Sequence, residues 1–168
     1  EPFKIGIAEV QANDESIQRR AYFEDYIGPR YNCEFIFSEQ CSSTDKILTF
    51  IENCADAGCD AVISYSNDDI EQMTQVCQEY GMMYVVNTVR INPKTEAAFA
   101  GGYENFAAFG SDQTAIGQVF SDWLKENASA DGSEGFLICS GLAYTGNLQQ
   151  TEITQACLTA LQDLYGLT

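Results

Sequence analysis

The alternation of short apolar runs with helix-length amphipathic segments constrains the fold of this 168-residue chain more than any other feature. Apolar runs recur six times, at residues 3–10, 34–37, 61–65, 83–87, 105–109 and 136–139. Segments with helical spacing of apolar residues lie at 16–27, 44–57, 68–80, 112–124 and 148–164. Strands that alternate with helices of this length predict right-handed βαβ units. We therefore expect an α/β fold with a parallel sheet flanked by helices.

Glycine and proline positions predict where several of these elements end. Gly28-Pro29 is expected to end the first helix, whose apolar side carries Ile17, Tyr22 and Tyr26. The segment that holds Pro93 and Gly101-Gly102 is expected to be a loop. Residues 127–134 contain no large apolar side chain and are typical of a linker.

Charge and export features restrict the partners and the compartment. The chain has 25 acidic and 8 basic residues, no His and a net charge of −17, so nucleic acid and anionic lipid surfaces would repel it. No run approaches the ~20 apolar residues that cross a bilayer. The sequence opens at Glu1 without an initiating Met or a signal peptide, as a mature exported protein does. We expect an extracytoplasmic protein, periplasmic or lipid-anchored at the cell surface.

Seven cysteines could bind metal, form disulfides or remain thiols. Their spacing fits no zinc pattern and His is absent, so no metal site is expected. Four are expected to be buried thiols on apolar helix faces or in a strand, namely Cys54, Cys77, Cys139 and Cys157. Three flank strands and could form one disulfide, namely Cys33, Cys41 and Cys59.

Sequence motifs of enzymes with this kind of fold are missing. The loop after the first strand lacks a Gly-x-Gly-x-x-Gly motif, and the chain has no Gly-Lys-Ser/Thr phosphate loop and no Gly-x-Ser-x-Gly elbow. Without His, neither a Ser-His nor a Cys-His pair can form. We expect no catalytic residue, no cofactor and a protein that is not an enzyme.

Open α/β sheets bind ligands beyond the carboxyl ends of their strands. This rule nominates the loops at 11–15, 38–42, 65–68, 87–90 and 140–147, whose amides, hydroxyls and carboxylates suit a polar solute. Arg90 can form two parallel hydrogen bonds to a hydroxyl pair or a carboxylate, or it is a surface residue with a nearby acidic partner. Tyr65 can stack on a sugar or base, or it is an ordinary aromatic residue at the edge of the loop. Trp123 is expected in a core or at an interface between lobes.

Four stretches follow the pattern of one protein family: Lys4–Glu9, Ala57–Ile63, Tyr80–Val86 and Gly110–Gly117. In these stretches the chain resembles the type I periplasmic binding proteins of sugar ABC transporters, the ribose- and galactose-binding family. The resemblance implies a Rossmann-like ligand-binding lobe over 1–110, a hinge, crossing helix and linker over 111–134, and an incomplete second lobe over 135–168. It places the hinge at Ser111 and Asp112. Residues 110–117 are similar to the family's hinge motif.

The expected ligand-binding residues combine the positions implied by this resemblance with the nominated loops: Gln11, Asn13, Glu15, Ser16, Ser64, Tyr65, Asn87 and Arg90. Where many sugar binders of the family place two aromatic side chains, this chain has Glu15 and Ser16. The expected function is capture of a small polar ligand, a sugar or sugar-like molecule, between two lobes for an ABC permease.

Two other functions stay open. One is a ligand-sensing effector domain of a transcriptional regulator or membrane receptor with the same fold, and the other is a small flavodoxin-like enzyme. The chain corresponds to a little over half of a family member, so we expect it to be truncated after the start of the second lobe. A chain that is truly this short would be expected to form a homodimer through its exposed sheet edge.

Overall fold

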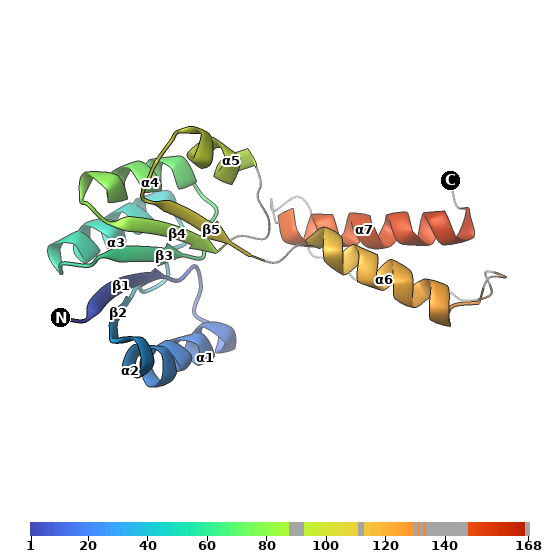
Figure 1. The fold of residues 1–168 in the computed structure, drawn as a ribbon, viewed down its shortest axis with the longest axis horizontal. Helices are drawn as coiled ribbons and strands as arrows, with labels where there is room; N and C mark the ends of the chain where they lie inside the picture. Colours follow the sequence, from blue (N-terminus) through green and yellow to red (C-terminus); the bar gives the residue numbers. More distant parts are fainter. Residues whose placement is uncertain (88–92, 111–112, 130, 132, 134–147, 167–168) are drawn as a thin grey trace. The chain divides into compact units, whose positions relative to one another are not determined.

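A computed structural model of the chain describes residues 1–87, 93–110, 113–129, 131, 133 and 148–166 (Figure 1). The chain divides into two compact units, Glu1–Gly110 and Ser111–Thr168. The expected hinge residues Ser111 and Asp112 and the expected strand at 136–139 lie outside the described residues.

The first unit is built on a parallel sheet of five strands: β1 Phe3–Ala8, β2 Cys33–Phe37, β3 Ala61–Ser64, β4 Met83–Asn87 and β5 Phe106–Phe109. Their order is β2-β1-β3-β4-β5, and every neighbouring pair is parallel. The expected α/β fold is confirmed. The chain runs from β1 outward to β2 and then returns to β3 on the other side of β1. The carboxyl ends of β1 and β3 therefore flank the switch in strand order, where open sheets of this kind bind their ligands.

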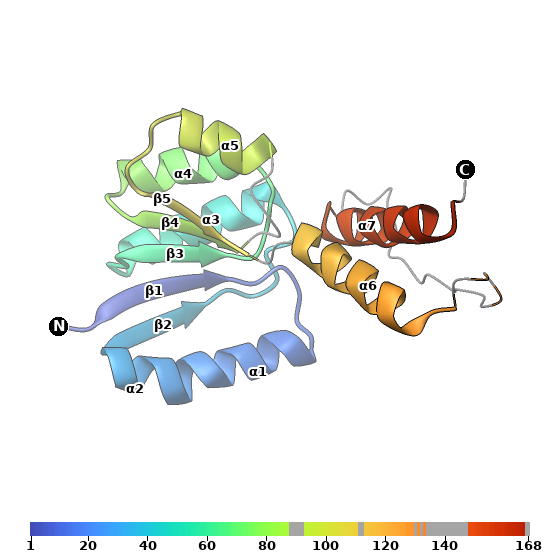
Figure 2. The same cartoon turned by 45° about the vertical axis from the view of Figure 1, so that its right-hand side comes forward.

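Helices cover the two faces of this sheet unequally (Figures 1 and 2). On one face a continuous helical stretch comprises α1 Asp14–Tyr22, the π-helix η1 Phe23–Ile27 and α2 Gly28–Tyr31, and its last two parts pack on β2. On the opposite face α3 Thr44–Asp56 packs on β1, α4 Ile70–Glu79 on β4 and α5 Pro93–Ala100 on β5.

The main core lies between the sheet and α3, α4 and α5. Ile47 and Ile51 of α3 and Met73 of α4 are fully buried there, and burial of each such side chain stabilises the fold by about 1.5–3 kcal/mol. Gly6 of β1 makes this packing possible, since a Cβ atom at this position would lie 2.4 Å from the Cys54 sulfur. The missing side chain thus lets α3 approach the centre of the sheet.

The expected end of the first helix at Gly28-Pro29 is wrong. Pro29 lies in the first turn of α2, where its missing N–H and fixed φ angle are tolerated. The helical backbone ends instead at Asn32, whose φ of 54° is left-handed. The apolar side chains of this helix are largely exposed, Ile17 to 64% and Tyr22 to 55%.

The loop expected between the fourth and fifth strands contains a helix, α5. Pro93 is the first residue of this helix, and Gly102 follows its last turn with a φ of 71°. Both residues therefore mark the ends of a helix of 8 residues. Ala98 and Thr95 on its inner side are fully buried.

The second unit contains two helices that pack against each other, α6 Gln113–Asn127 and α7 Leu148–Tyr165. They approach closely, since a Cβ atom at Gly117 would lie 2.2 Å from the Cβ atom of Ala156. Leu124 is buried between them with Leu161. Trp123 is 55% exposed, so it is not part of this unit's core. Among the described residues, no helix has the length and apolar character that crossing a membrane requires.

Candidate functional site

Backbone hydrogen bonds from three strand ends fix the position of Glu9 at the switch in strand order. The Glu9 N–H donates to the Ser38 hydroxyl over 2.9 Å, and the Glu9 carbonyl accepts from the Cys41 N–H over 2.7 Å. The Tyr65 N–H donates to the Ala8 carbonyl over 3.1 Å. The loops after β1, β2 and β3 thus form one connected framework.

Arg19 of α1 joins two carboxylates above this framework. Its Nε and Nη2 donate to the two oxygens of Glu9 over 2.9 and 2.6 Å, and its Nη1 donates to Glu15 over 2.8 Å. The side chains of Arg19 and Glu9 are only 19% and 10% exposed, whereas that of Glu15 is 77% exposed. The hydrogen bonds with Glu9 raise the pKa of Arg19 above its already high usual value, so this guanidinium is always charged.

Tyr65 connects the Arg19 cluster with the end of β4. The Arg19 guanidinium carbon lies 3.8 Å from the centre of the Tyr65 ring, in the geometry of a cation–π contact. The Asn87 side chain is near enough to the Tyr65 hydroxyl to lower its pKa. Burial raises the pKa of this phenol despite the opposing effect of Arg19, so the phenol is neutral at physiological pH. Arg19 covers one face of the ring, and Tyr65 as a whole is half-buried.

A cavity of ≈ 330 Å³ adjoins these residues. Glu9, Gln11 and Ser16 line it together with the segment 37–40 that follows β2. Its wall is rigid because Asn13 and Ser16 form a reciprocal cap on α1: each side chain accepts a hydrogen bond from the other residue's backbone N–H, over 2.9 and 3.0 Å.

The structure brings together five of the eight predicted ligand-binding residues. Gln11 and Ser16 line the cavity, Glu15 and Tyr65 both contact Arg19, and Asn87 is a neighbour of Tyr65. Of the other three, Asn13 caps α1, and Ser64 is fully buried with its hydroxyl accepting from the Ser66 N–H over 3.1 Å. Arg90 lies outside the described residues.

Glu9 and Arg19 are functional candidates that the sequence interpretation missed. The apolar run at 3–10 places Glu9 inside the first strand, but β1 ends at Ala8 and Glu9 begins the loop. Arg19 lies in the middle of a helix, where an arginine is ordinarily a solvated surface group. The available signal was the scarcity of basic residues, of which the chain has 8, combined with two acidic residues, at ten and four positions before Arg19.

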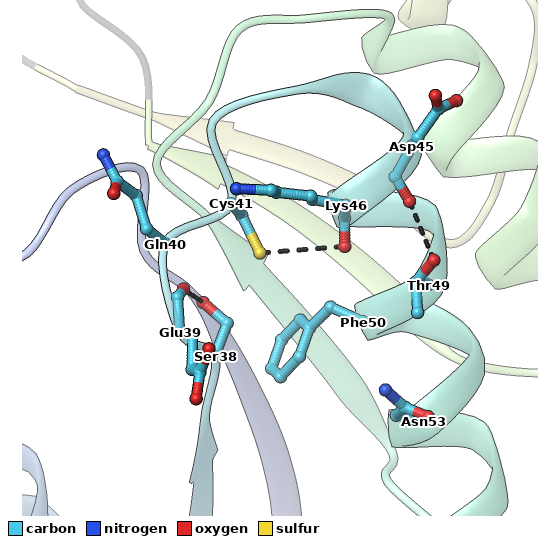
Figure 3. Close-up of a pocket in the computed structure, with 9 residues that line it drawn as sticks. All are labelled: Ser38, Glu39, Gln40, Cys41, Asp45, Lys46, Thr49, Phe50 and Asn53. Carbon is cyan, nitrogen blue, oxygen red and sulfur yellow. Dashed lines mark hydrogen bonds between the residues drawn. The ribbon is translucent and has the colours of Figure 1, made fainter.

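A larger cavity of ≈ 580 Å³ lies on the other side of segment 38–40, against α3 (Figure 3). The Phe50 side chain points toward its centre, between segment 38–40 and the polar residues of α3. Those polar groups already bond locally: the Thr49 hydroxyl donates to the Asp45 carbonyl, and the Lys46 ammonium donates to Ser42. We assign the candidate site to the smaller cavity, because that one adjoins the Glu9–Arg19–Tyr65 cluster at the switch in strand order.

The described part of the chain gathers no group of three or more His, Cys, Asp or Glu side chains that could hold a metal ion. The candidate site contains three carboxylates: those of Glu9 and Glu15, which are bound to Arg19, and that of Glu39, which lines the cavity. The arrangement therefore offers hydrogen-bond donors and acceptors together with an aromatic edge.

Solved structures share this fold along nearly the whole chain. One is an ABC transporter periplasmic solute-binding protein from Actinobacillus succinogenes with bound D-allose. It is 22% identical to this chain with a TM-score of 0.73, and the match covers 98% of this chain and 56% of that protein. The chain has the fold of the type I sugar ABC transporter solute-binding proteins. No family model matches the sequence, and no curated protein matches it.

Two further sugar-binding proteins extend this likeness. A solute-binding protein from Clostridium phytofermentas with bound L-rhamnose is 16% identical with a TM-score of 0.64, over 99% of this chain and 49% of that one. The periplasmic binding protein of the arabinose ABC transporter from Shewanella sp. ANA-3 is 11% identical with a TM-score of 0.67. That match covers 98% of this chain and 51% of the Shewanella protein. This chain spans about half the length of the solved structures it matches.

Proposed function

We propose that this chain is about half of an extracytoplasmic solute-binding protein that delivers a small carbohydrate to an ABC permease. The cavity beside Glu9, Arg19 and Tyr65 would form the first lobe's half of the ligand site, and a second lobe would supply the other half. Ser111 and Asp112 would serve as the hinge, so that ligand binding favours the closed arrangement of the lobes.

The charge of the site favours a neutral ligand. Glu9, Glu15 and Glu39 contribute three negative charges against the two positive charges of Arg19 and Arg20, and the whole chain carries −17. An anionic solute would therefore meet repulsion both at long range and at contact. A neutral polyhydroxylated molecule meets none and can use every group present.

The hydrogen-bonding capacity of the cluster suits sugar hydroxyls. A guanidinium has five N–H donors, and the bonds from Arg19 to Glu9 and Glu15 use three of them. Two remain for ligand oxygens, while the exposed amide of Gln11 provides a donor and an acceptor beside the cavity. The part of the Tyr65 ring that Arg19 does not cover would provide an apolar surface for the C–H groups of a sugar ring.

One observation carries this proposal: a preorganised polar cluster lies at the switch in strand order of a fold shared with sugar-binding proteins. The flavodoxin-like alternative has the same strand order. However, Glu9, Glu15 and Tyr65 occupy the carboxyl edge of this sheet, and an anionic flavin phosphate is disfavoured beside these two carboxylates.

The test is ligand binding by the full-length natural protein. Neutral and acidic monosaccharides would be screened by thermal shift and the hits measured by calorimetry. We expect a neutral sugar to bind and Arg19→Ala to weaken it by about 10- to 100-fold, which corresponds to one lost charged hydrogen bond. Arg30→Ala, on the same helical stretch but outside the cavity, should leave the affinity unchanged.

Two results would overturn the proposal. One is the failure of every carbohydrate to bind while circular dichroism shows a folded protein. The other is a purified protein with the visible absorbance of a bound flavin, which would favour the enzyme instead.

A further inference from the structure

The end of α3 holds two cysteine side chains in the relation of a helix-terminating motif. Gly58, with a φ of 72°, follows the last turn of the helix. The Cys59 N–H donates to the Cys54 carbonyl over 2.9 Å, and the Gly58 N–H donates to the Ala55 carbonyl over 3.0 Å. These are the two hydrogen bonds of a Schellman motif, in which the side chains of the first and last residues contact each other. Here both of those residues are cysteines.

The two thiols meet inside the core of the first unit. Cys54 is fully buried and Cys59 is 7% exposed, and both belong to the main core cluster. The two thiols are near enough that each shifts the pKa of the other. The Cys54 sulfur lies against Gly6 of β1, in the space that the missing glycine side chain leaves. The helix end therefore holds the two cysteines as neighbours in the core.

The matching motif at the end of α4 shows what is particular to this pair. There Gly81 has a φ of 71°, the Met82 N–H donates to the Cys77 carbonyl over 2.8 Å, and the Gly81 N–H donates to the Gln78 carbonyl over 3.0 Å. The contact made by the side chains is a thiol with a thioether, the ordinary apolar contact of this motif. Only in the motif that ends α3 are both partners able to form a covalent bond.

We propose that Cys54 and Cys59 are a disulfide-forming pair that closes the turn at the end of α3. The structure holds both as thiols. In the oxidised protein each thiol loses its proton and one electron, a sulfur–sulfur bond forms, and a low-molecular-weight disulfide is reduced to two thiols. The sequence left a different pairing open, among Cys33, Cys41 and Cys59, and all three are thiols in the structure.

The burial of the pair sets the rate of this reaction. Burial raises the pKa of both Cys54 and Cys59, and only the thiolate attacks a disulfide. Oxidation of the folded chain is therefore slow and requires opening of the helix end. Oxidation is faster while α3 is still forming. We therefore expect the disulfide to form during folding in an oxidising compartment.

Peptide mapping of the natural chain tests the link. The protein would be refolded with oxidised and reduced glutathione, alkylated in denaturant and cleaved before Asp residues. Cleavage before Asp45, Asp56 and Asp60 separates the two cysteines into peptides 45–55 and 56–59. We expect these peptides to remain joined until a reductant is added. Free alkylation of both cysteines, or a link of either one to another cysteine, would overturn the proposal.

Thermal unfolding provides a second readout with a matched control. Reduction should lower the melting temperature of the oxidised wild-type protein by several degrees, because the cross-link restricts the unfolded chain. Cys77→Ala removes an equally buried thiol of the same core and should keep this response to reductant. Cys59→Ala should abolish it. The proposal fails if wild type and Cys59→Ala respond to reductant alike, and this outcome is independent of whether a sugar binds.

Discussion

The ion pair between Glu9 and Arg19 should contribute far more to stability than the other ion pairs on the same helix. Two charged hydrogen bonds join these residues, over 2.6 and 2.9 Å, and the side chains are 10% and 19% exposed. At an effective dielectric constant of about 20, opposite charges 4 Å apart attract by about 4 kcal/mol. Desolvation of both groups offsets part of this attraction. We expect a coupling free energy of about 2–3 kcal/mol, the range for hydrogen bonds between charged groups.

A double-mutant cycle isolates this coupling. The single variants are Glu9→Gln and Arg19→Met, and the free energy of unfolding of each is compared with that of the double variant by urea denaturation. The contacts of Arg19 with Glu15 and Tyr65 are lost in both variants that lack the arginine, so they cancel from the coupling. What remains is the free energy specific to the pair with Glu9.

The same helix provides the control cycle. Arg20 and Glu24 form an ion pair at 3.3 Å whose side chains are 56% and 50% exposed. Such an exposed pair contributes about 0.3–0.5 kcal/mol. Since both cycles remove an arginine from one turn of α1, differences in helix propensity are matched. A coupling for Glu9 and Arg19 no larger than that of the control pair would refute the view that the cluster is preorganised.

Three further predictions concern single sites of the first unit. Gly6→Ala should destabilise the unit by about 1–3 kcal/mol, because the new Cβ atom would lie 2.4 Å from the Cys54 sulfur. The loss of unfolding free energy, measured in urea, should be smaller in a Cys54→Ala background. An equal loss in both backgrounds would contradict the steric explanation. Asn13→Ala removes the capping box of α1 and should cost about 1 kcal/mol, visible as a lower urea midpoint. Burial raises the pKa of Cys77 from 9.0 to about 12, so the folded thiol keeps its proton while the unfolded one ionises, and stability is lost as the pH rises from 9 towards 12. By pH 11 this loss amounts to about 2–3 kcal/mol, and Cys77→Ala should show a correspondingly flatter dependence of the urea midpoint on pH.

The parallel sheet was predictable because its signal is local and repeated. Each strand is a short apolar run, and each run in the first unit lies between turn residues that the sequence displays. The helix α5 was not predictable in the same way. With 8 residues it is too short for a clear apolar period, and the Pro and Gly residues at its ends also suit a loop. Gly28-Pro29 is ambiguous in the same way, because this pair suits a helix end as well as the first turn of a helix. In the structure, a π-helix precedes the pair and α2 begins at Gly28.

For the candidate site, the sequence predicts the loops but not the contacts between their side chains. The loops that build it follow from one topological rule, and five of the eight predicted residues do meet there. The sequence does not show that Arg19 is the arginine that organises these residues. Ten positions separate Arg19 from Glu9, and the two belong to different parts of the fold. Their bond exists only because α1 starts beside the carboxyl end of β1 and places its second turn above Glu9. An arginine in a helix is usually a solvated surface group, and only the burial of its partner distinguishes this one.

The pairing of Arg19 also changes what Tyr65 can do. Without the arginine, both faces of this ring would be available for stacking, as in a site that holds a sugar between aromatic side chains. With the guanidinium 3.8 Å from the ring centre, the ring is held in one orientation and one face is occupied. In the proposed site, recognition of the sugar near Tyr65 would therefore depend mainly on directed hydrogen bonds. It follows that loss of Arg19 should broaden ligand selectivity as well as weaken binding, because a released Tyr65 can stack on many rings.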